Sequence, residues 1–240
     1  KLSETNIIWE ELLNLKFVNQ LDSEIKTLDS LYFLYPQVRE IFDGQSLVIS
    51  AHLTDEEKFN FLFLFNIPPS VGNNTIFELS KGISAGTIPS EKDYDGAAIT
   101  TFHPPAEDRS GAFSFSIYND IFIGSFNAML VEDAVRQINS GKSLMEDLAF
   151  NKVISTSGGK ADGNLLINHK YFPDFMATFT KKEYGSSLLT LKTFADWTAL
   201  DLKIKPNVLM LNGFTFSNDS LTKFLNFFKQ QKPQPADFTE

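Results

Sequence analysis

The sequence contains no cysteine. This absence excludes disulfide bonds, thiolate metal ligands and a cysteine nucleophile. Arginine is also scarce, because only Arg39, Arg109 and Arg136 occur among 21 basic residues, and the formal net charge is −9. Binding to nucleic acid requires a basic surface, and no run of Lys and Arg provides one here. We therefore predict that nucleic acid is not a partner.

Long apolar runs are absent as well. The longest run, at residues 61–65, has the length of a strand, whereas a membrane-spanning helix needs about 18 apolar residues. The chain begins at Lys1 rather than at methionine, so we expect either a processed form or a fragment, and loss of a signal peptide or of a lipid anchor is one of the alternatives that stay open. Membrane association is then expected only through such an anchor.

Phenylalanine, in contrast, is abundant, with 24 residues against 2 Trp and 6 Tyr. Core filling by aromatic side chains is the first interpretation, and a pocket for an apolar ligand is the second. Phe alternates with other residues over 59–65. A period of two places alternate side chains on one face of a strand, so we predict that Phe59, Phe61, Phe63 and Phe65 form its buried face.

Periodicity and turn residues predict a mixture of helices and antiparallel strands. In the first part of the chain, helices are expected at 9–31, 30–41, 75–81 and 127–139, strands at 46–53, 59–65 and 94–102, and a hairpin at 112–126. In the second part, helices are expected at 144–154 and 221–229, strands at 165–169 and 187–194, a hairpin at 198–216, and helix or an irregular edge at 172–179.

The order of these elements repeats along the chain. Residues 112–123 align without a gap onto residues 199–210, and both turns fall at the same place. Chance similarity between two hairpin–helix units is the alternative. We predict an internal duplication and an α+β fold of two related helix–antiparallel-sheet–helix halves. The predicted boundaries are 1–142 for the first repeat, 143–231 for the second and 232–240 for a linker or tail.

Three histidines, His52, His103 and His169, are the main candidates for chemistry. None belongs to a His-x-x-x-His or a His-Glu pair, so we predict no metal site. His103 lies in a predicted loop and is the best catalytic candidate, because a serine and four acidic residues are near it in sequence: Asp93, Asp95, Glu107, Asp108 and Ser110. Since this spacing matches no known triad, we predict no catalytic residue and no cofactor.

Short motif matches have simpler explanations. Ser157 and Lys160 match the Ser-x-x-Lys motif of some acyl transferases, but matches of this kind are as frequent as chance predicts, and we interpret residues 155–163 as a surface loop. Gly141-Lys142-Ser143 resembles the end of a phosphate-binding loop that lacks its first Gly.

Acidic motifs are interpreted in the same way. Asp93-x-Asp95-Gly96 lacks the later calcium ligands, so a solvated turn is expected. The acidic pairs Glu56-Glu57 and Glu132-Asp133 are expected on polar faces rather than as acid/base couples.

Three segments carry a family resemblance. Residues 47–53 read Leu-Val-Ile-Ser-Ala-His-Leu, residues 116–126 read Ser-Ile-Tyr-Asn-Asp-Ile-Phe-Ile-Gly-Ser-Phe, and residues 164–173 read Asn-Leu-Leu-Ile-Asn-His-Lys-Tyr-Phe-Pro. With them the chain resembles the N-terminal part of a family of large, uncharacterised envelope proteins of Bacteroidetes. The resemblance implies an exported or anchored parent with a longer C-terminal region, and it supplies no catalytic residues.

These observations favour a non-catalytic interaction module, periplasmic or exposed in the cell envelope, whose partner is a protein or another envelope component. A cytoplasmic location is the alternative, because the absence of cysteine fits either compartment. The alternative is a carrier of an apolar or lipid-like ligand held between helix and sheet. An enzyme is the third and least favoured class. A filled core with an open sheet edge supports the first reading, and a large closed apolar cavity supports the second.

Overall fold

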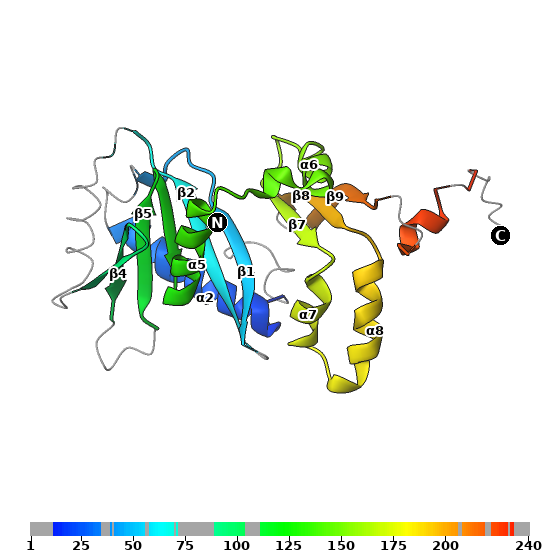
Figure 1. Ribbon diagram of the computed structural model, residues 1–240, viewed down its shortest axis with the longest axis horizontal. Helices are drawn as coiled ribbons and strands as arrows, with labels where there is room; N and C mark the ends of the chain where they lie inside the picture. Colours follow the sequence, from blue (N-terminus) through cyan, green and yellow to red (C-terminus); the bar gives the residue numbers. More distant parts are fainter. Residues whose placement is uncertain are drawn as a thin grey trace. The chain divides into compact units, whose positions relative to one another are not determined.

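The computed structural model describes residues 12–34, 39, 41–55, 58–69, 71, 89–103, 111–205, 208–218, 222–229 and 231–232. These residues form a mixed α+β structure with five α-helices and two antiparallel sheets (Figure 1). The α+β class predicted from the sequence is therefore confirmed. The chain divides into two compact units, one from Leu13 to Lys142 and one that contains the residues from Ser143 onwards.

The 13–142 unit is built on a six-stranded sheet in the order β1-β2-β6-β5-β4-β3. Its strands, in chain order, are β1 (Val48–Asp55), β2 (Lys58–Asn66), β3 (Ser90–Tyr94), β4 (Ala97–Phe102), β5 (Phe113–Tyr118) and β6 (Ile121–Ser125). All neighbours are antiparallel. β2 is interior because it pairs with β1 on one side and β6 on the other, whereas β1 and β3 are the two edges of this sheet.

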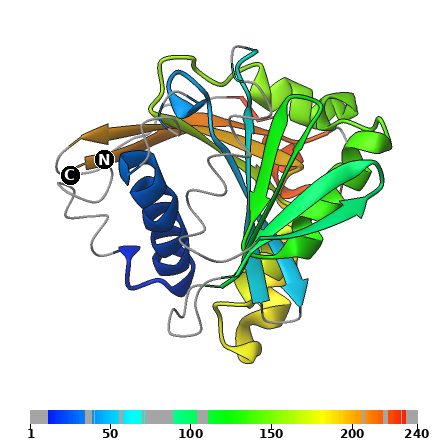
Figure 2. The same ribbon diagram turned by 90° about the vertical axis from the view of Figure 1, so that its left-hand side faces the viewer.

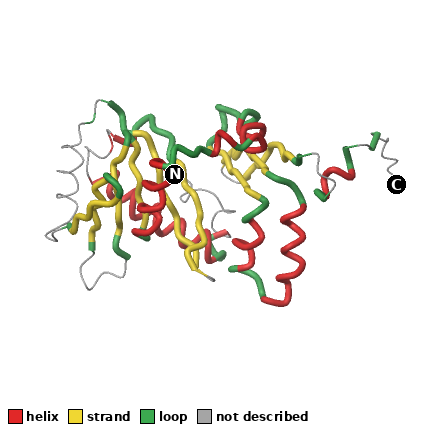
Figure 3. Tube along the Cα trace, viewed as in Figure 1, coloured by secondary structure: helices red, strands yellow, loops and turns green. Residues whose placement is uncertain are grey.

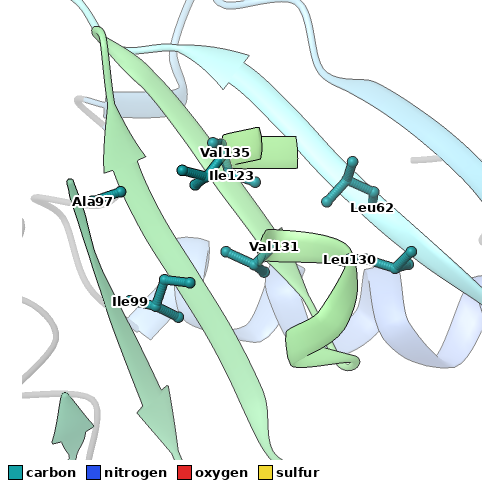
Figure 4. Packing of buried hydrophobic residues seen from close by; sticks show 7 residues of the cluster. All are labelled: Leu62, Ala97, Ile99, Ile123, Leu130, Val131 and Val135. Carbon is teal, nitrogen blue, oxygen red and sulfur yellow. The ribbon is translucent and has the colours of Figure 1, made fainter. Parts of the chain in front are cut away.

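Helices cover both faces of this sheet, α2 (Lys16–Leu34) on one and α5 (Ala128–Asn139) on the other (Figure 2). The ring of Phe17 in α2 lies 5.6 Å and 5.3 Å from the rings of Phe59 and Phe61. On the opposite face, α5 packs three buried side chains against β2, β4 and β6. Figure 4 shows this cluster, which consists of Leu62, Ala97, Ile99, Ile123, Leu130, Val131 and Val135.

The alternating phenylalanines of β2 occupy the face that α2 covers. All four are buried, and Phe61 and Phe63 are only 1% exposed, so the predicted buried face is confirmed. Further along the same sheet face, ring stacks fill the space: the Phe65 and Phe122 centroids are 4.7 Å apart and those of Phe122 and Phe115 are 5.6 Å apart. Phenylalanine thus fills this core with its own side chains.

Two tight turns connect neighbouring strands in this sheet. Asn119 and Asp120, which join β5 to β6, both have positive φ (51° and 61°), and so do Asp95 and Gly96, which join β3 to β4 (51° and 83°). Such turns match the twist of a hairpin and favour Asn, Asp and Gly. The hairpin at 112–126 is confirmed. The strand predicted at 94–102 is confirmed over 97–102 as β4, but its start is wrong, because Asp95-Gly96 forms the turn that joins β3 to β4.

The second unit contains a three-stranded sheet in the order β7-β8-β9. Its strands are β7 (Gly163–Asn168), β8 (Trp197–Lys205) and β9 (Val208–Phe216). Helix α6 (Leu148–Ile154) packs Phe150 and Val153 against Trp197 and Ala199 of β8. Between β7 and β8 along the chain, α7 (Phe172–Ala177) and α8 (Gly185–Leu189) run side by side (Figure 3).

Four 3-10 helices complete the described elements: η1 (Leu144–Glu146), η2 (Lys182–Tyr184), η3 (Thr190–Thr193) and η4 (Phe224–Phe227). They correct three predictions. The strand expected at 187–194 is wrong, because α8 and η3 occupy it and the leucines at 188, 189 and 191 fit a helical turn as well as a strand. The helix at 144–154 is split at Asp147, which caps α6. The helix at 221–229 is reduced to η4.

Some predictions fall outside the described residues. These are the helix at 75–81, parts of those at 9–31 and 30–41, and all but residue 232 of the tail at 232–240.

No duplication is shown by the described part of the chain. The two aligned hairpins differ in their neighbours, because β6 pairs with β2 as well as β5, whereas β9 pairs with β8 alone. The upstream strands differ too: β1 pairs with β2 and is not a neighbour of β5, while β7 pairs directly with β8.

Candidate functional site

In the described ranges, no group of three His, Asp or Glu side chains could hold a metal ion. Over the same ranges, no helix combines the length and the apolar character that crossing a membrane requires.

The residues grouped around His103 in the sequence are not all brought together. His103 follows β4, and its Nε2 lies 3.4 Å from Ser90 Oγ. Asp93 and Asp95 lie towards the other end of the β3–β4 hairpin, because Ser90 pairs with Thr101 while Asp93 pairs with Ala98. Glu107, Asp108 and Ser110 lie outside the described residues. The structure therefore separates His103 from Asp93 and Asp95.

The acidic residues near this hairpin have structural partners. Asp95 Oδ2 accepts a hydrogen bond from Asn139 Nδ2 at 2.8 Å. Glu132 pairs with Lys92 at 2.8 Å, and Asp133 pairs with Arg136 at 2.6 Å. These contacts join the hairpin to α5 or lie along α5, as expected for polar faces and a solvated turn. Glu56 and Glu57 lie outside the described residues.

The other motif residues serve local structure. Ser157 Oγ is buried and has no hydrogen-bond partner among the described residues, so no hydrogen bond joins it to Lys160. Gly141 has a φ of 68° just after α5, a conformation that glycine adopts readily at a helix end. Ser143 Oγ accepts a hydrogen bond from the backbone N–H of Met145 and caps η1.

His169 makes the contact closest to catalytic geometry. Its Nε2 lies 2.8 Å from Thr198 Oγ1, and that hydroxyl lies 2.9 Å from Thr215 Oγ1. A histidine bonded to a hydroxyl is the arrangement of a base and its nucleophile. The sequence analysis missed this pair, because only the register of β7 and β8 brings together two residues 29 positions apart.

Burial argues against a catalytic role for this pair. His169 is 7% exposed and Thr198 is 6% exposed, and within the described ranges His169 Nδ1 has no hydrogen-bond partner that could orient the ring. Burial lowers the pKa of His169, the charge of Lys223 lowers it further, and Asp196 opposes both effects. Burial therefore favours the neutral form of the ring, which lies in a cross-strand network with the hydroxyl groups of Thr198 and Thr215.

His52 lies on edge strand β1, where its Nε2 is 2.8 Å from Ser50 Oγ. Burial lowers the pKa of His52, and the nearby charge of Asp133 opposes the shift. The described residues thus place the three histidines apart, on β1, just after β4 and just after β7, with three different hydroxyl partners.

Two edge strands expose apolar side chains instead. On β1 these are Val48, Ile49 and Leu53. On β9 they are Val208, Met210, Leu211 and Phe214. The opposite edge of the six-stranded sheet, β3, carries Glu91, Lys92 and Asp93, the charged composition by which proteins keep edges unpaired. The apolar edges are therefore the candidate interaction surfaces.

Comparison of the chain with protein-family models, with curated proteins and with solved structures found no match.

Proposed function

We propose that this protein is a non-catalytic interaction module that binds an extended polypeptide segment of a partner protein along strand β1. One observation carries the proposal: among the strands that the structure describes, β1 is an edge without a charged residue from Val48 to Thr54, and its apolar side chains are exposed. An open edge presents unpaired backbone groups, and an added strand gains affinity from backbone hydrogen bonds and specificity from alternate side chains.

The charge of the unit defines the partner further. Residues 13–142 include 17 acidic and 9 basic residues, which gives this unit a formal charge of −8. An approaching strand is attracted over long range when it carries Lys or Arg. We therefore expect an apolar, basic segment rather than an acidic one.

The filled core supports this function over the carrier of an apolar or lipid-like ligand. On the face of β2 that α2 covers, phenylalanine rings pack against one another rather than enclosing a space. For example, the ring centroids of Phe42 and Phe65 are 4.4 Å apart. The enzyme class is disfavoured by the separation of His103 from Asp93 and Asp95 and by the burial of His169 and Thr198.

Location and ancestry stay predictions. The resemblance to envelope proteins of Bacteroidetes supports a periplasmic or envelope-exposed module, and fractionation of cells that express the full-length parent would test it. The internal duplication is retained only for β4-β5-β6 and β7-β8-β9, which share an antiparallel order. Superposition of these two strand triplets with experimental coordinates would test that relation.

Site-specific photo-crosslinking in native envelope preparations tests the proposal. A crosslinking amino acid at Val48 on β1 is compared with the same amino acid at Glu91 on β3, an exposed position on the opposite edge. We expect one discrete adduct from Val48, mapped by mass spectrometry to a basic apolar segment, and a lower yield at high salt. Equal adducts from both edges, or none from Val48, would overturn the proposal.

A further inference from the structure

Strand β9 is a second sheet edge with exposed apolar side chains, in the other unit of the chain. Its nine residues include no ionisable side chain. Phe214 is 62% exposed, Leu211 51%, Val208 44% and Met210 40%, and in the described residues β9 pairs with β8 alone. Long apolar edges without charge or proline pair readily with another strand. A stable protein with such an edge needs something to cover it.

The hydrogen bonds of β8 determine which backbone groups of β9 point outward. On the β7 side, Leu202 C=O accepts from the backbone N–H of Asp162 at 2.9 Å, and Ile204 N–H donates to the Asp162 carboxylate at 2.8 Å. Backbone direction alternates along a strand, so Asp201 faces β9 and its partner Asn212 faces β8. The residues of β9 that alternate with Asn212, namely Leu209, Leu211 and Gly213, therefore direct their N–H and C=O groups towards the open edge.

We propose that β9 pairs in an antiparallel manner with β9 of a second copy of this chain, around a two-fold axis at Asn212. The two three-stranded sheets become one sheet of six strands. In this register Met210 faces the partner subunit's Phe214, Leu211 faces the partner subunit's Gly213, and Asn212 faces the partner subunit's Asn212. Met210 and Phe214, which share a face of β9 with Asn212, are each paired with an apolar side chain of the partner subunit, and the two Asn212 amides can bond to each other.

Charge favours a second copy as the occupant of this edge. The part of the chain from 143 to 240 carries 11 basic and 10 acidic residues, so its formal charge is only +1. Two nearly neutral units approach without the repulsion that would oppose pairing of two β1 edges, which belong to units of charge −8. A two-fold pairing also places no like charges opposite each other within β9, because the strand has none.

The mass of the full chain in solution tests the proposal, starting from a monomer of 27.0 kDa. Analytical ultracentrifugation should show a concentration-dependent dimer. Met210→Glu places a carboxylate opposite the partner subunit's Phe214, and Phe214→Lys places an ammonium opposite the partner subunit's Met210. Each variant alone should raise the dissociation constant by at least about tenfold, because a charge is desolvated against an apolar side chain.

Mixing these two variants should restore the dimer. In the mixed dimer, one site pairs the introduced Glu with the introduced Lys, and the other retains Met opposite Phe. Val48→Glu on β1 is the control and should leave the dimer unchanged, so failure of this inference and failure of the proposed β1 function are distinguishable. Circular dichroism of each variant should match the wild type, because both substituted side chains are exposed.

The absence of cysteine allows a direct measurement of the register. In the proposed pairing, the Cα atoms of Asn212 and its symmetry mate lie about 4.5 Å apart, as in a pair without direct hydrogen bonds. Asn212→Cys should therefore form an intermolecular disulfide under mild oxidation. Met210→Cys, displaced by four residues from its own mate, should not. A monomeric wild-type chain, a mixture that fails to restore dimers, or equal crosslinking by both cysteine variants would overturn the proposal.

Discussion

Strands β2 and β9 have the same length and the same number of apolar residues, but they have opposite environments. Each has nine residues, six of them apolar. Five residues of β2 are buried, whereas none of β9 is. β2 lies between two strands and beneath two helices, while β9 has one neighbouring strand. Composition therefore identifies both as strands, and only their neighbours decide which one belongs to a core.

The helix that packs on the second sheet explains part of this difference. The cluster around α6 contains Phe150, Val153, Trp197 and Ala199, with Phe216 packed at its margin. Phe216 is the last residue of β9, and Lys152 Nζ lies 5.2 Å from its ring centroid. The α6 cluster thus includes the end of β9 at Phe216 and leaves Met210 and Phe214 exposed. Exposure along β9 is a consequence of this limited cover.

The largest expected difference between the two strands is in the free energy of unfolding after equivalent Phe→Ala substitutions. Phe63→Ala in β2 should lower the free energy of unfolding by about 3–5 kcal/mol, because it removes a buried ring and leaves a cavity. Phe214→Ala in β9 should change it by less than about 0.5 kcal/mol in the monomer. Chemical denaturation at low protein concentration measures both values. Similar losses for the two variants would show that the strands are not in different environments.

Removal of the buried Ser125 hydroxyl should give the second-largest loss of stability. Ser125 Oγ is fully buried and donates to the carbonyl oxygen of Phe61 at 2.7 Å, beyond the last backbone pair between β2 and β6. Ser125→Ala should destabilise the protein by about 1–3 kcal/mol, because the buried carbonyl loses this donor. Ser140→Ala is the matched control, since its hydroxyl donates to Gln137 C=O at an exposed site. If thermal unfolding midpoints of both variants fall equally, the carbonyl has another partner.

In the second unit, the side chain of Asp147 also accepts hydrogen bonds that join two elements, and its removal should cost less stability than removal of the Ser125 hydroxyl. Its Oδ1 accepts from the backbone N–H groups of Ala149 and Phe150, and its Oδ2 accepts from Trp197 Nε1 at 3.0 Å, which joins α6 to β8. Asp147→Ala should cost about 1 kcal/mol, the usual value of a helix N-cap. Asp147→Asn keeps a cap and should cost less. Equal losses in urea denaturation would contradict a capping role.

The pKa of Asp147 adds a dependence on pH to this prediction. Burial acts to raise that pKa, but the hydrogen bonds from Trp197 and the two backbone N–H groups outweigh it, and the net shift is downward from 3.8. When folding lowers the pKa of a carboxyl group, the ionised group stabilises the fold. This stabilisation is complete above the pKa of the unfolded state and is lost as pH falls through the pKa of the folded state. The difference between wild type and Asp147→Ala should therefore shrink below pH 3.8.

The smallest expected effect is a pH dependence that both units share. Burial lowers the pKa of His52 in one unit and of His169 in the other. The stability from each neutral ring is complete above 6.5, the ordinary pKa, and is lost as pH falls through the lowered value. His169→Gln, which retains a polar group near Thr198, should reduce the fall in melting temperature between neutral and mildly acidic pH. If the melting temperature of His169→Gln falls as much as that of the wild type, groups other than His169 cause the pH dependence.

The misses of the sequence analysis have specific causes. Strand β3 was not recognised as separate because Glu91, Lys92 and Asp93 are unusual in strands, although they suit an edge. The segment from 187 to 194 was predicted as a strand, because a short apolar run has no clear period. The His169–Thr198 contact could not be found, since it depends on which residues face each other across β7 and β8.

What the sequence determined by itself is local. Alternation defined the buried face of β2, Asn119-Asp120 and Asp95-Gly96 have the residue types that tight turns accept, and Asn127 and Gly141 mark the two ends of α5. Each of these depends on residues within a few positions of one another. The tertiary structure alone decided that β2 is interior and β9 is an edge, because strand order depends on pairing between segments far apart in the chain, and burial follows from that order rather than from composition.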